Sequence, residues 1–141
     1  MSEANLRTRD ALRVLARLSR ILENADSGVT VPQYRMLCAL SEGGERSARL
    51  ARRLAIRKPT ATALADGLVA AGYATRGGDA DDRRVVRLEL TPHGVEAVAK
   101  ADTAYQLALA PLLEKLKDPD GFLDNLLTIG HAMDESLAVA P

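Results

Sequence analysis

The chain has 141 residues, no formal net charge, 47% hydrophobic residues and 3% aromatic residues. Its length suits one domain, with or without an oligomerisation arm, and its core must be built from Leu, Val and Ala, a composition that favours helices. The single cysteine, the charged N-terminus and the lack of any apolar run near ~20 residues argue against a disulfide scaffold, a signal peptide and a membrane span, so we expect a cytoplasmic protein.

Two helices are predicted in the N-terminal part of the chain. The first covers residues 5–25, where apolar residues form one stripe at helical spacing. Its five arginines form a basic surface that we interpret as a solvated face rather than a phosphate contact: Arg7, Arg9, Arg13, Arg17 and Arg20. Thr30 is predicted to cap the second helix, with Pro32 in its first turn. Cys38 lies within that helix, and we interpret it as a buried thiol rather than a redox sensor.

A pair of short helices is predicted between residues 47 and 72. Ser47 is a good N-cap for the first, and residues 55–57 make the turn. Pro59 suits the first turn of the second helix, and Gly72 ends it. The inward stripe of the second helix is Ala61, Leu64, Ala65 and Leu68. Its opposite face has small side chains, which can approach base edges closely: Pro59, Thr60, Thr62, Ala63, Asp66 and Gly67.

A β-hairpin is predicted to follow the helix pair. Residues 73–76 and 85–90 read as strands, and the sequence GGDADD between them is a polar tip. Arg83 and Arg84 come just after the tip, where an arginine can enter the negative potential of a DNA minor groove. A short strand at residues 45–46 is expected to join this sheet. The order of elements is that of a winged helix-turn-helix.

Two further helices are predicted in the C-terminal part, with more apolar surface than the winged-helix core can cover. Thr91 and Pro92 start a long helix with a coiled-coil-like stripe from Val95 to Leu116, which Pro111 is expected to kink or break. A turn at residues 118–121 precedes a last helix that is partly apolar on both faces. A second copy of the chain is the expected cover, and an intramolecular bundle with the first helix is the alternative.

The positive charge of the chain is concentrated in the helix pair and the hairpin. Residues 46–87 contain ten Lys or Arg and four Asp, a formal charge of +6 in a chain of net charge zero. A charge run alone usually means a solvated face, but this one coincides with a winged helix-turn-helix, which favours nucleic-acid binding. Arg49, Arg52 and Arg53 lie on the first helix of the pair, which is expected to cross the phosphate backbone.

Residues 31–94 resemble the MarR family of bacterial transcriptional regulators. The matching segments are VPQYRMLCAL at 31–40, SARLARRL at 47–54, KPTATALADGLVAAGYATR at 58–76 and DRRVVRLELTPHG at 82–94. The last is the most specific, because an Asp, an Arg two residues later and a strand closing in Leu-Thr before a Gly form the wing of this family. The chain departs from the family at Ala63, where a larger polar or basic residue is common, and this bears on which bases are read.

The resemblance implies a mainly α (α+β winged helix) fold in one domain, 1–141. Residues 30–94 would form the DNA-binding lobe, and residues 1–25 with 95–141 the dimerisation helices. It implies a homodimeric, nucleoid-associated repressor, less often an activator, that binds a palindromic operator in double-stranded DNA. The expected DNA-binding residues are Arg49, Arg57, Lys58, Pro59, Thr60, Thr62, Ala63, Arg83 and Arg84, with Asp82 supporting the wing.

The resemblance also implies release of the DNA by a small-molecule effector, aromatic or phenolic, bound near Arg17, Tyr34 and the start of the 92–117 helix. There are two alternatives. One is a winged helix used only for protein binding, and the other is a non-specific architectural DNA-binding protein without a ligand. We expect no enzyme, cofactor or metal, because His93 and His131 lack Cys or His partners at metal spacing. The sequence GGDADD likewise lacks the Lys and the helix of a phosphate-binding loop.

Overall fold

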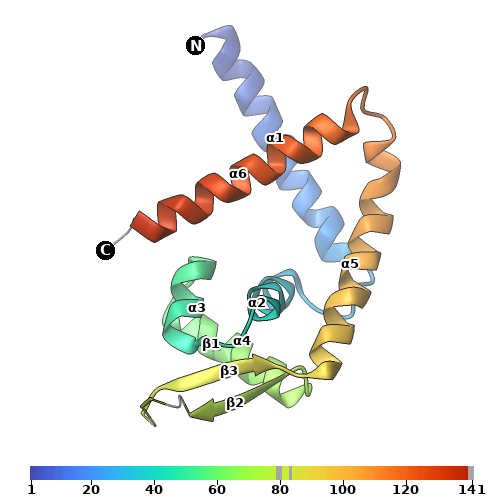
Figure 1. Cartoon of the computed structure of the whole chain (residues 1–141). Coiled ribbons are helices and arrows are strands. Elements are labelled where there is room, and N and C mark those ends of the chain that lie inside the picture. The colour runs from blue at the N-terminus through green and yellow to red at the C-terminus, as the bar shows by residue number, and fades with distance from the viewer. Residues whose placement is uncertain (79–80, 83, 140–141) are drawn as a thin grey trace.

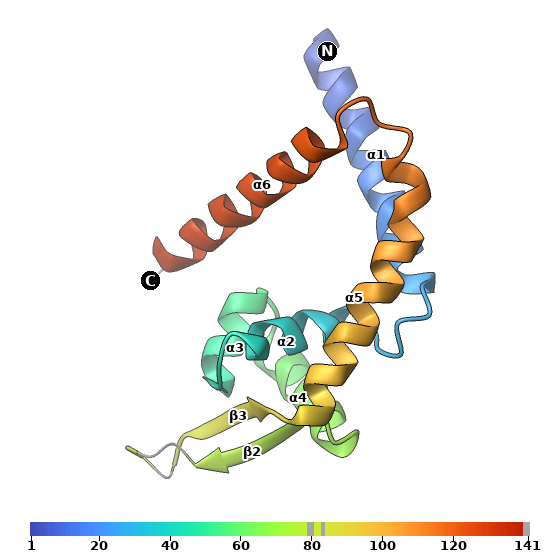
Figure 2. The same ribbon diagram turned by 45° about the vertical axis from the view of Figure 1, so that its right-hand side comes forward.

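The computed structural model describes residues 1–78, 81–82 and 84–139, and shows a winged-helix lobe with three long helices outside it (Figure 1). The elements in chain order are α1 (Glu3–Asn24), α2 (Val31–Ser41), β1 (Glu45–Arg46), α3 (Ser47–Leu54), α4 (Lys58–Ala70), β2 (Ala74–Gly78), β3 (Val86–Leu90), α5 (Pro92–Leu113) and α6 (Pro119–Val139). The lobe runs from α2 to β3. From it α5 extends past α1, and α6 then turns back toward α3 (Figure 2).

The core of the lobe comes from the inward stripes that the sequence predicts. Three residues of α2 and one each of α3, α4 and β3 are fully buried: Met36, Leu37, Leu40, Leu50, Leu68 and Leu88. Ala61 and Ala65 of α4 are also buried, so the predicted inner face of this helix is confirmed. Small residues there let α4 approach the core closely and leave its other face to solvent.

The three strands form an antiparallel sheet in the order β1-β3-β2, with Ala74 opposite Leu90 and Glu45 opposite Leu88. The predicted first strand, 73–76, is misplaced at both ends. Tyr73 lies outside it because its N–H donates to the carbonyl of Leu68 at the end of α4, at 2.9 Å, and pairing instead continues to Gly78. The second strand begins at Val86 rather than at residue 85.

Two of the three predicted N-caps are confirmed. Thr30 accepts from the N–H of Gln33, whose side chain accepts in return from the N–H of Thr30, which completes a capping box. Thr91 accepts from the N–H of Gly94 at 3.0 Å. The prediction for Ser47 is wrong: β1 runs directly into α3, so Ser47 is already helical and Arg46 occupies the cap position without a side-chain capping bond.

The long helices have little buried surface. No residue of α1 is buried, and its predicted solvated arginines are exposed. Of the two effects expected of Pro111, the break is wrong, since α5 continues to Leu113 with Pro111 in its last turn. Leu116 therefore lies outside the helix, and the expected stripe is shorter. Among the described residues, no helix is long and apolar enough to cross a membrane.

Candidate nucleic-acid interface

The outer face of α4 is a continuous exposed surface of small side chains. Its exposed residues are Pro59, Thr60, Thr62, Ala63 and Asp66. The hydroxyl of Thr62 donates to the carbonyl of Lys58 at 3.0 Å, so its proton is used within the helix, while its acceptor positions and methyl group are available to a partner. Such a surface fits close contact with base edges.

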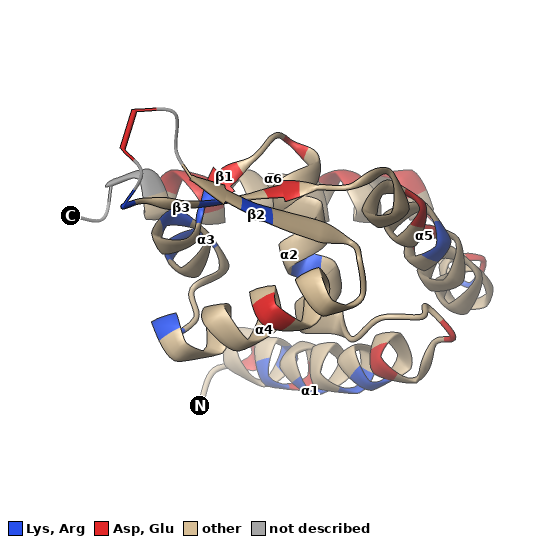
Figure 3. Ribbon diagram, turned by 90° about the horizontal axis from the view of Figure 1, so that it is seen from below, with Lys and Arg blue, Asp and Glu red and all other residues tan. Residues whose placement is uncertain are grey.

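The N-terminal end of α4 is positively charged. Arg57 is the N-cap residue, Lys58 is the first residue of the helix, and both are exposed. Neither forms an ion pair with another described residue. Unpaired N–H groups and the helix dipole attract anions at a helix N-terminus, and two cations add to this attraction. Figure 3 shows basic segments on α3, on α4 and on β2.

The carboxylate of Asp82 contacts Arg84 on the wing. This carboxylate accepts from the backbone N–H of Arg84 at 3.0 Å and from the Arg84 Nε at 3.2 Å. The Arg84 side chain is 91% exposed, so the contact directs it without burying it. Arg83, which the sequence also assigns to DNA, lies outside the described residues.

Three side-chain contacts that the sequence reasoning missed join different segments of the lobe. Arg76 of β2 donates to Asp66 on the outer face of α4 at 2.5 Å. Arg35 of α2 donates to the carbonyl of Leu54 at the end of α3, at 2.8 Å. Arg87 of β3 donates to the carbonyl of Gly44 at 2.7 Å. The opposite charges of Arg76 and Asp66, on either side of a turn, were a signal in the sequence for the first contact. Each of the other two contacts joins an arginine to a backbone carbonyl in a distant segment of the chain.

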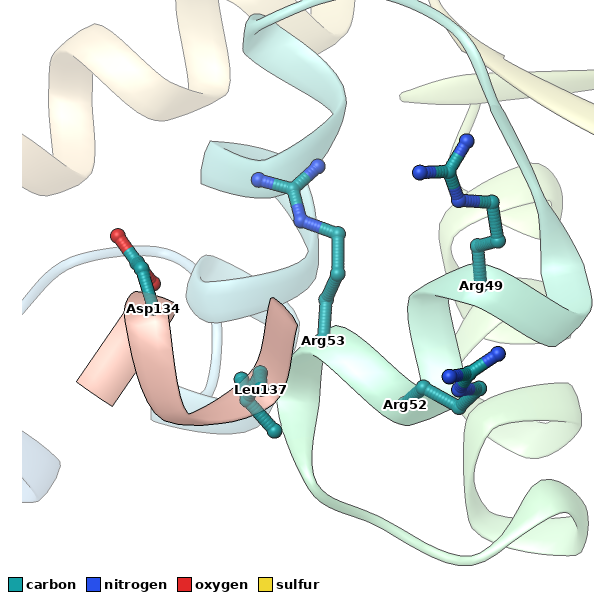
Figure 4. A pocket seen from close by; sticks show the side chains of 5 residues that line it. All are labelled: Arg49, Arg52, Arg53, Asp134 and Leu137. Carbon is teal, nitrogen blue, oxygen red and sulfur yellow. The ribbon is translucent and has the colours of Figure 1, made fainter. Parts of the chain in front are cut away.

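The arginines of α3 line an open groove between α3 and the last turns of α6. Figure 4 shows Arg49, Arg52 and Arg53 together with Asp134 and Leu137 around this groove, whose volume is about 440 Å³. Arg53 forms an ion pair with Glu42 at 2.5 Å. The predicted phosphate-contacting residue Arg49 lies within 4.0 Å of Glu45 and belongs to this groove.

A cluster of polar and aromatic side chains joins the lobe to α5. The hydroxyl of Tyr34 on α2 donates to Asp102, and the rings of Tyr34 and Tyr105 meet edge to face with centroids 4.7 Å apart. Burial, and then the hydrogen bond to Asp102, raise the pKa of Tyr34 well above its ordinary value. Burial likewise raises the pKa of the Cys38 thiol one turn further along α2.

The two residues expected at an effector site differ in their surroundings. Tyr34 belongs to the α2–α5 cluster, whereas Arg17 is exposed on α1. No hydrogen bond or ion pair between described residues joins them, and neither lines the α3–α6 groove. The described residues also hold no group of three His, Cys, Asp or Glu that could bind a metal ion.

The sequence and the fold both match known proteins. The MarR family model matches residues 27–85, which include the helix pair and β2 but end before β3. The transcriptional regulator YhbI of Bacillus subtilis, itself uncharacterized, is 32% identical over 100 residues, which are 70% of this chain and 64% of YhbI. The comparisons thus relate this chain to the MarR family.

Solved structures of other regulators share the fold of this chain. BldR from Sulfolobus solfataricus superposes with a TM-score of 0.77 at 23% identity, over 94% of this chain and 99% of BldR. A mutant of MarR from E. coli, complexed with operator DNA, superposes with a TM-score of 0.70 at 24% identity, over 86% of this chain and 90% of MarR. These structural likenesses confirm the winged-helix fold. The match to YhbI spans less than two thirds of the length of that protein, 64%.

Proposed function

We propose that this chain is a sequence-specific DNA-binding transcriptional regulator. The exposed outer face of α4 carries the proposal, because it combines small side chains with Arg57 and Lys58 at its N-terminal end. The exposed guanidinium of Arg84 adds a wing contact. In this function α4 reads base edges in the major groove, the cations of its first turn bind phosphate, and the wing reaches the adjacent minor groove.

The proposed regulator is a homodimer formed by α1, α5 and α6. Large apolar side chains on all three helices are exposed in the single chain, including Leu15, Leu107, Leu127 and Met133. Exposed apolar surface on three neighbouring helices is most simply covered by the same helices of a second copy, related by a two-fold axis. Two α4 helices about 34 Å apart then meet successive major grooves, which makes the operator an imperfect palindrome.

The proposed mode of control is repression that an aromatic or phenolic small molecule relieves. The effector binds where the lobe meets the long helices, near Tyr34 and Arg17. Support comes from the aromatic pair of Tyr34 and Tyr105 at this junction, because a ligand there contacts both the lobe and α5. A ligand that binds two lobe orientations with different affinity shifts the balance between them, and with it the affinity for DNA.

Retention of genomic DNA fragments by the purified protein at ~150 mM salt tests the proposed function. We expect enrichment of one palindromic site. Weak retention of all fragments would instead indicate an architectural DNA-binding protein, and no retention in the presence or absence of aromatic ligands would indicate a protein-binding module.

A pair of matched variants shows which surface binds the retained DNA. Arg84→Gln should lower the slope of log affinity against log salt by about two, because it removes one cation from each of the two wings of the dimer. Arg7→Gln removes an exposed cation from α1 and should leave the slope unchanged. Equal effects of the two variants would contradict the assignment of the wing.

A further inference from the structure

The first turn of α5 is attached firmly to the lobe. The Thr91 hydroxyl donates to the carbonyl of Gly72 at 2.6 Å, and the Thr91 N–H donates to the carbonyl of Tyr73 at 3.0 Å. Gly94 lies so close to the segment before β2 that a Cβ atom on it would be 2.1 Å from the Tyr73 carbonyl oxygen. The base of α5 therefore behaves as a fixed pivot.

A second attachment follows higher on α5 and is made to α2. Ala97 and Ala101 are buried, which lets the two helices approach closely, and Asp102 and Tyr105 then contact Tyr34. Beyond Tyr105 no residue of α5 is buried, and Leu107 is 70% exposed. The Tyr34 cluster is thus the last buried contact of α5 before the helix enters the proposed dimer arm.

We propose that the hydrogen bond from Tyr34 to Asp102 sets the angle between the DNA-binding lobe and α5, and so the distance between the two α4 helices of the dimer. Tyr34 and Asp102 are positioning residues for operator binding in this scheme. The inference rests on the proposed function, because it requires a dimer that binds two half-sites. Among the described residues this is the one hydrogen bond between α2 and α5.

The position of this bond along α5 gives it leverage. Asp102 is eight residues from Gly94, or about 12 Å along the helix, and Leu113 is 19 residues from Gly94, or about 28 Å. A movement of about 1 Å at Asp102 therefore displaces the far end of α5 by about 2.4 Å relative to the lobe. Two protomers together would change the separation of the α4 helices by about 5 Å, which exceeds the rise of about 3.4 Å per base pair.

The chemistry of the pair suits a fixed contact. The phenol is in its protonated, donating form at neutral pH, as in any tyrosine, and burial and the neighbouring carboxylate raise its pKa further. A hydrogen bond to a carboxylate is stronger and more directional than one between neutral groups. The ring of Tyr34 still contacts Tyr105 if the hydroxyl is removed, so the hydroxyl can be tested separately from the aromatic contact.

The test measures affinity for the enriched palindrome with its natural spacing, with one base pair inserted and with one base pair removed. A single half-site serves as reference. The parent protein should prefer the natural spacing by at least about tenfold over either altered spacing. Tyr34→Phe should bind the half-site like the parent but lose most of this preference.

Two further variants make the result specific. Tyr105→Phe is the matched control: it is also a loss of one phenolic hydroxyl, and that hydroxyl is buried without a hydrogen-bond partner among the described residues. It should keep the parent's spacing preference. Asp102→Ala removes the acceptor of the same hydrogen bond, so it should lose the spacing preference as Tyr34→Phe does. It also provides the test if Tyr34→Phe does not fold.

Unchanged spacing preference in folded Tyr34→Phe or Asp102→Ala would overturn the positioning role, while the parent's preference would still support the proposed dimer. Equal loss in Tyr105→Phe would also overturn it, since the aromatic cluster as a whole would then be responsible. A parent protein that binds all three spacings equally would overturn both the inference and the dimeric operator.

Discussion

Thr62 lies within the exposed face of α4. Like Thr60, it can offer both a hydroxyl and a methyl group to a base edge. We expect Thr62→Ala to change sequence preference more than general affinity, because a lost base contact costs about 1–3 kcal/mol at one position of the site. Affinities for the enriched operator and for a random duplex measure the two effects separately.

A matched control for this variant is Thr103→Ala on α5. Thr103 is exposed, and its hydroxyl donates to the carbonyl of Ala99 at 3.1 Å, as that of Thr62 does to Lys58. The control should leave both affinities unchanged. Equal losses on operator and random DNA for Thr62→Ala would refute its role in base readout.

Cys38 is expected to react slowly. Burial is the main cause that raises the pKa of its thiol, the carboxylates of Asp102 and Glu42 act in the same direction, and the hydrogen bond with Tyr34 opposes them. A raised pKa leaves less of the reactive thiolate at any pH below it. At pH 8, iodoacetamide should modify Cys38 at least about tenfold more slowly in the folded than in the unfolded protein, and the folded rate should rise with pH. Equal rates at pH 8 would show a reactive thiol and support redox sensing.

The elements of the lobe depend on one close approach between α5 and the sheet. In Gly94→Ala the new Cβ would meet the Tyr73 carbonyl oxygen at 2.1 Å and a Leu90 methyl carbon at 2.8 Å. Because the first contact is with backbone, either α5 or the segment before β2 must shift, and we expect a loss of about 3 kcal/mol in the free energy of unfolding. Urea denaturation measures this loss.

Gly77→Ala on β2 is the comparison for that experiment. A Cβ at Gly77 meets nothing within 4 Å, so this variant should unfold with nearly the parent's free energy. If Gly94→Ala were as stable as Gly77→Ala, α5 would not be held against Tyr73 in the way the structure shows.

The sequence predicts the elements well where the information is local. Periodic apolar residues define the inner face of α4, and Thr30 and Thr91 mark the start of their helices. Strand ends were misplaced because they depend on which backbone groups a neighbouring element already uses, as at Tyr73. The same limit applies to Ser47, whose capping geometry is removed by the direct connection of β1 to α3.

The candidate site could be predicted residue by residue but not as an assembly. The small face of α4 and the basic wing follow from spacing and charge. The contacts that orient them, Arg76 with Asp66 and Tyr34 with Asp102, join residues 10 and 68 positions apart in the chain. No local pattern specifies such pairs, because they depend on how the elements pack.

The proposed dimer would bury the exposed apolar faces of three helices, α1, α5 and α6. Leu127 is 62% exposed on α6 in the single chain. If it lies in the dimer interface, Leu127→Asp buries a charge without a partner and should weaken self-association at least about 100-fold. Sedimentation measures the change. Val86→Asp, at an apolar position 45% exposed on the wing, should leave the dimer intact. A Leu127→Asp variant that remains dimeric would place the interface elsewhere.

The salt dependence of affinity for the enriched palindrome tests the central claim most directly, because a surface that binds DNA phosphates must release counterions. A dimer that contacts about six to ten phosphates should lose about 10³-fold or more in affinity between ~50 and ~200 mM salt. At each salt concentration it should bind the palindrome more tightly than a random duplex. An affinity that barely changes over this range, or that is equal for both duplexes, would contradict the account.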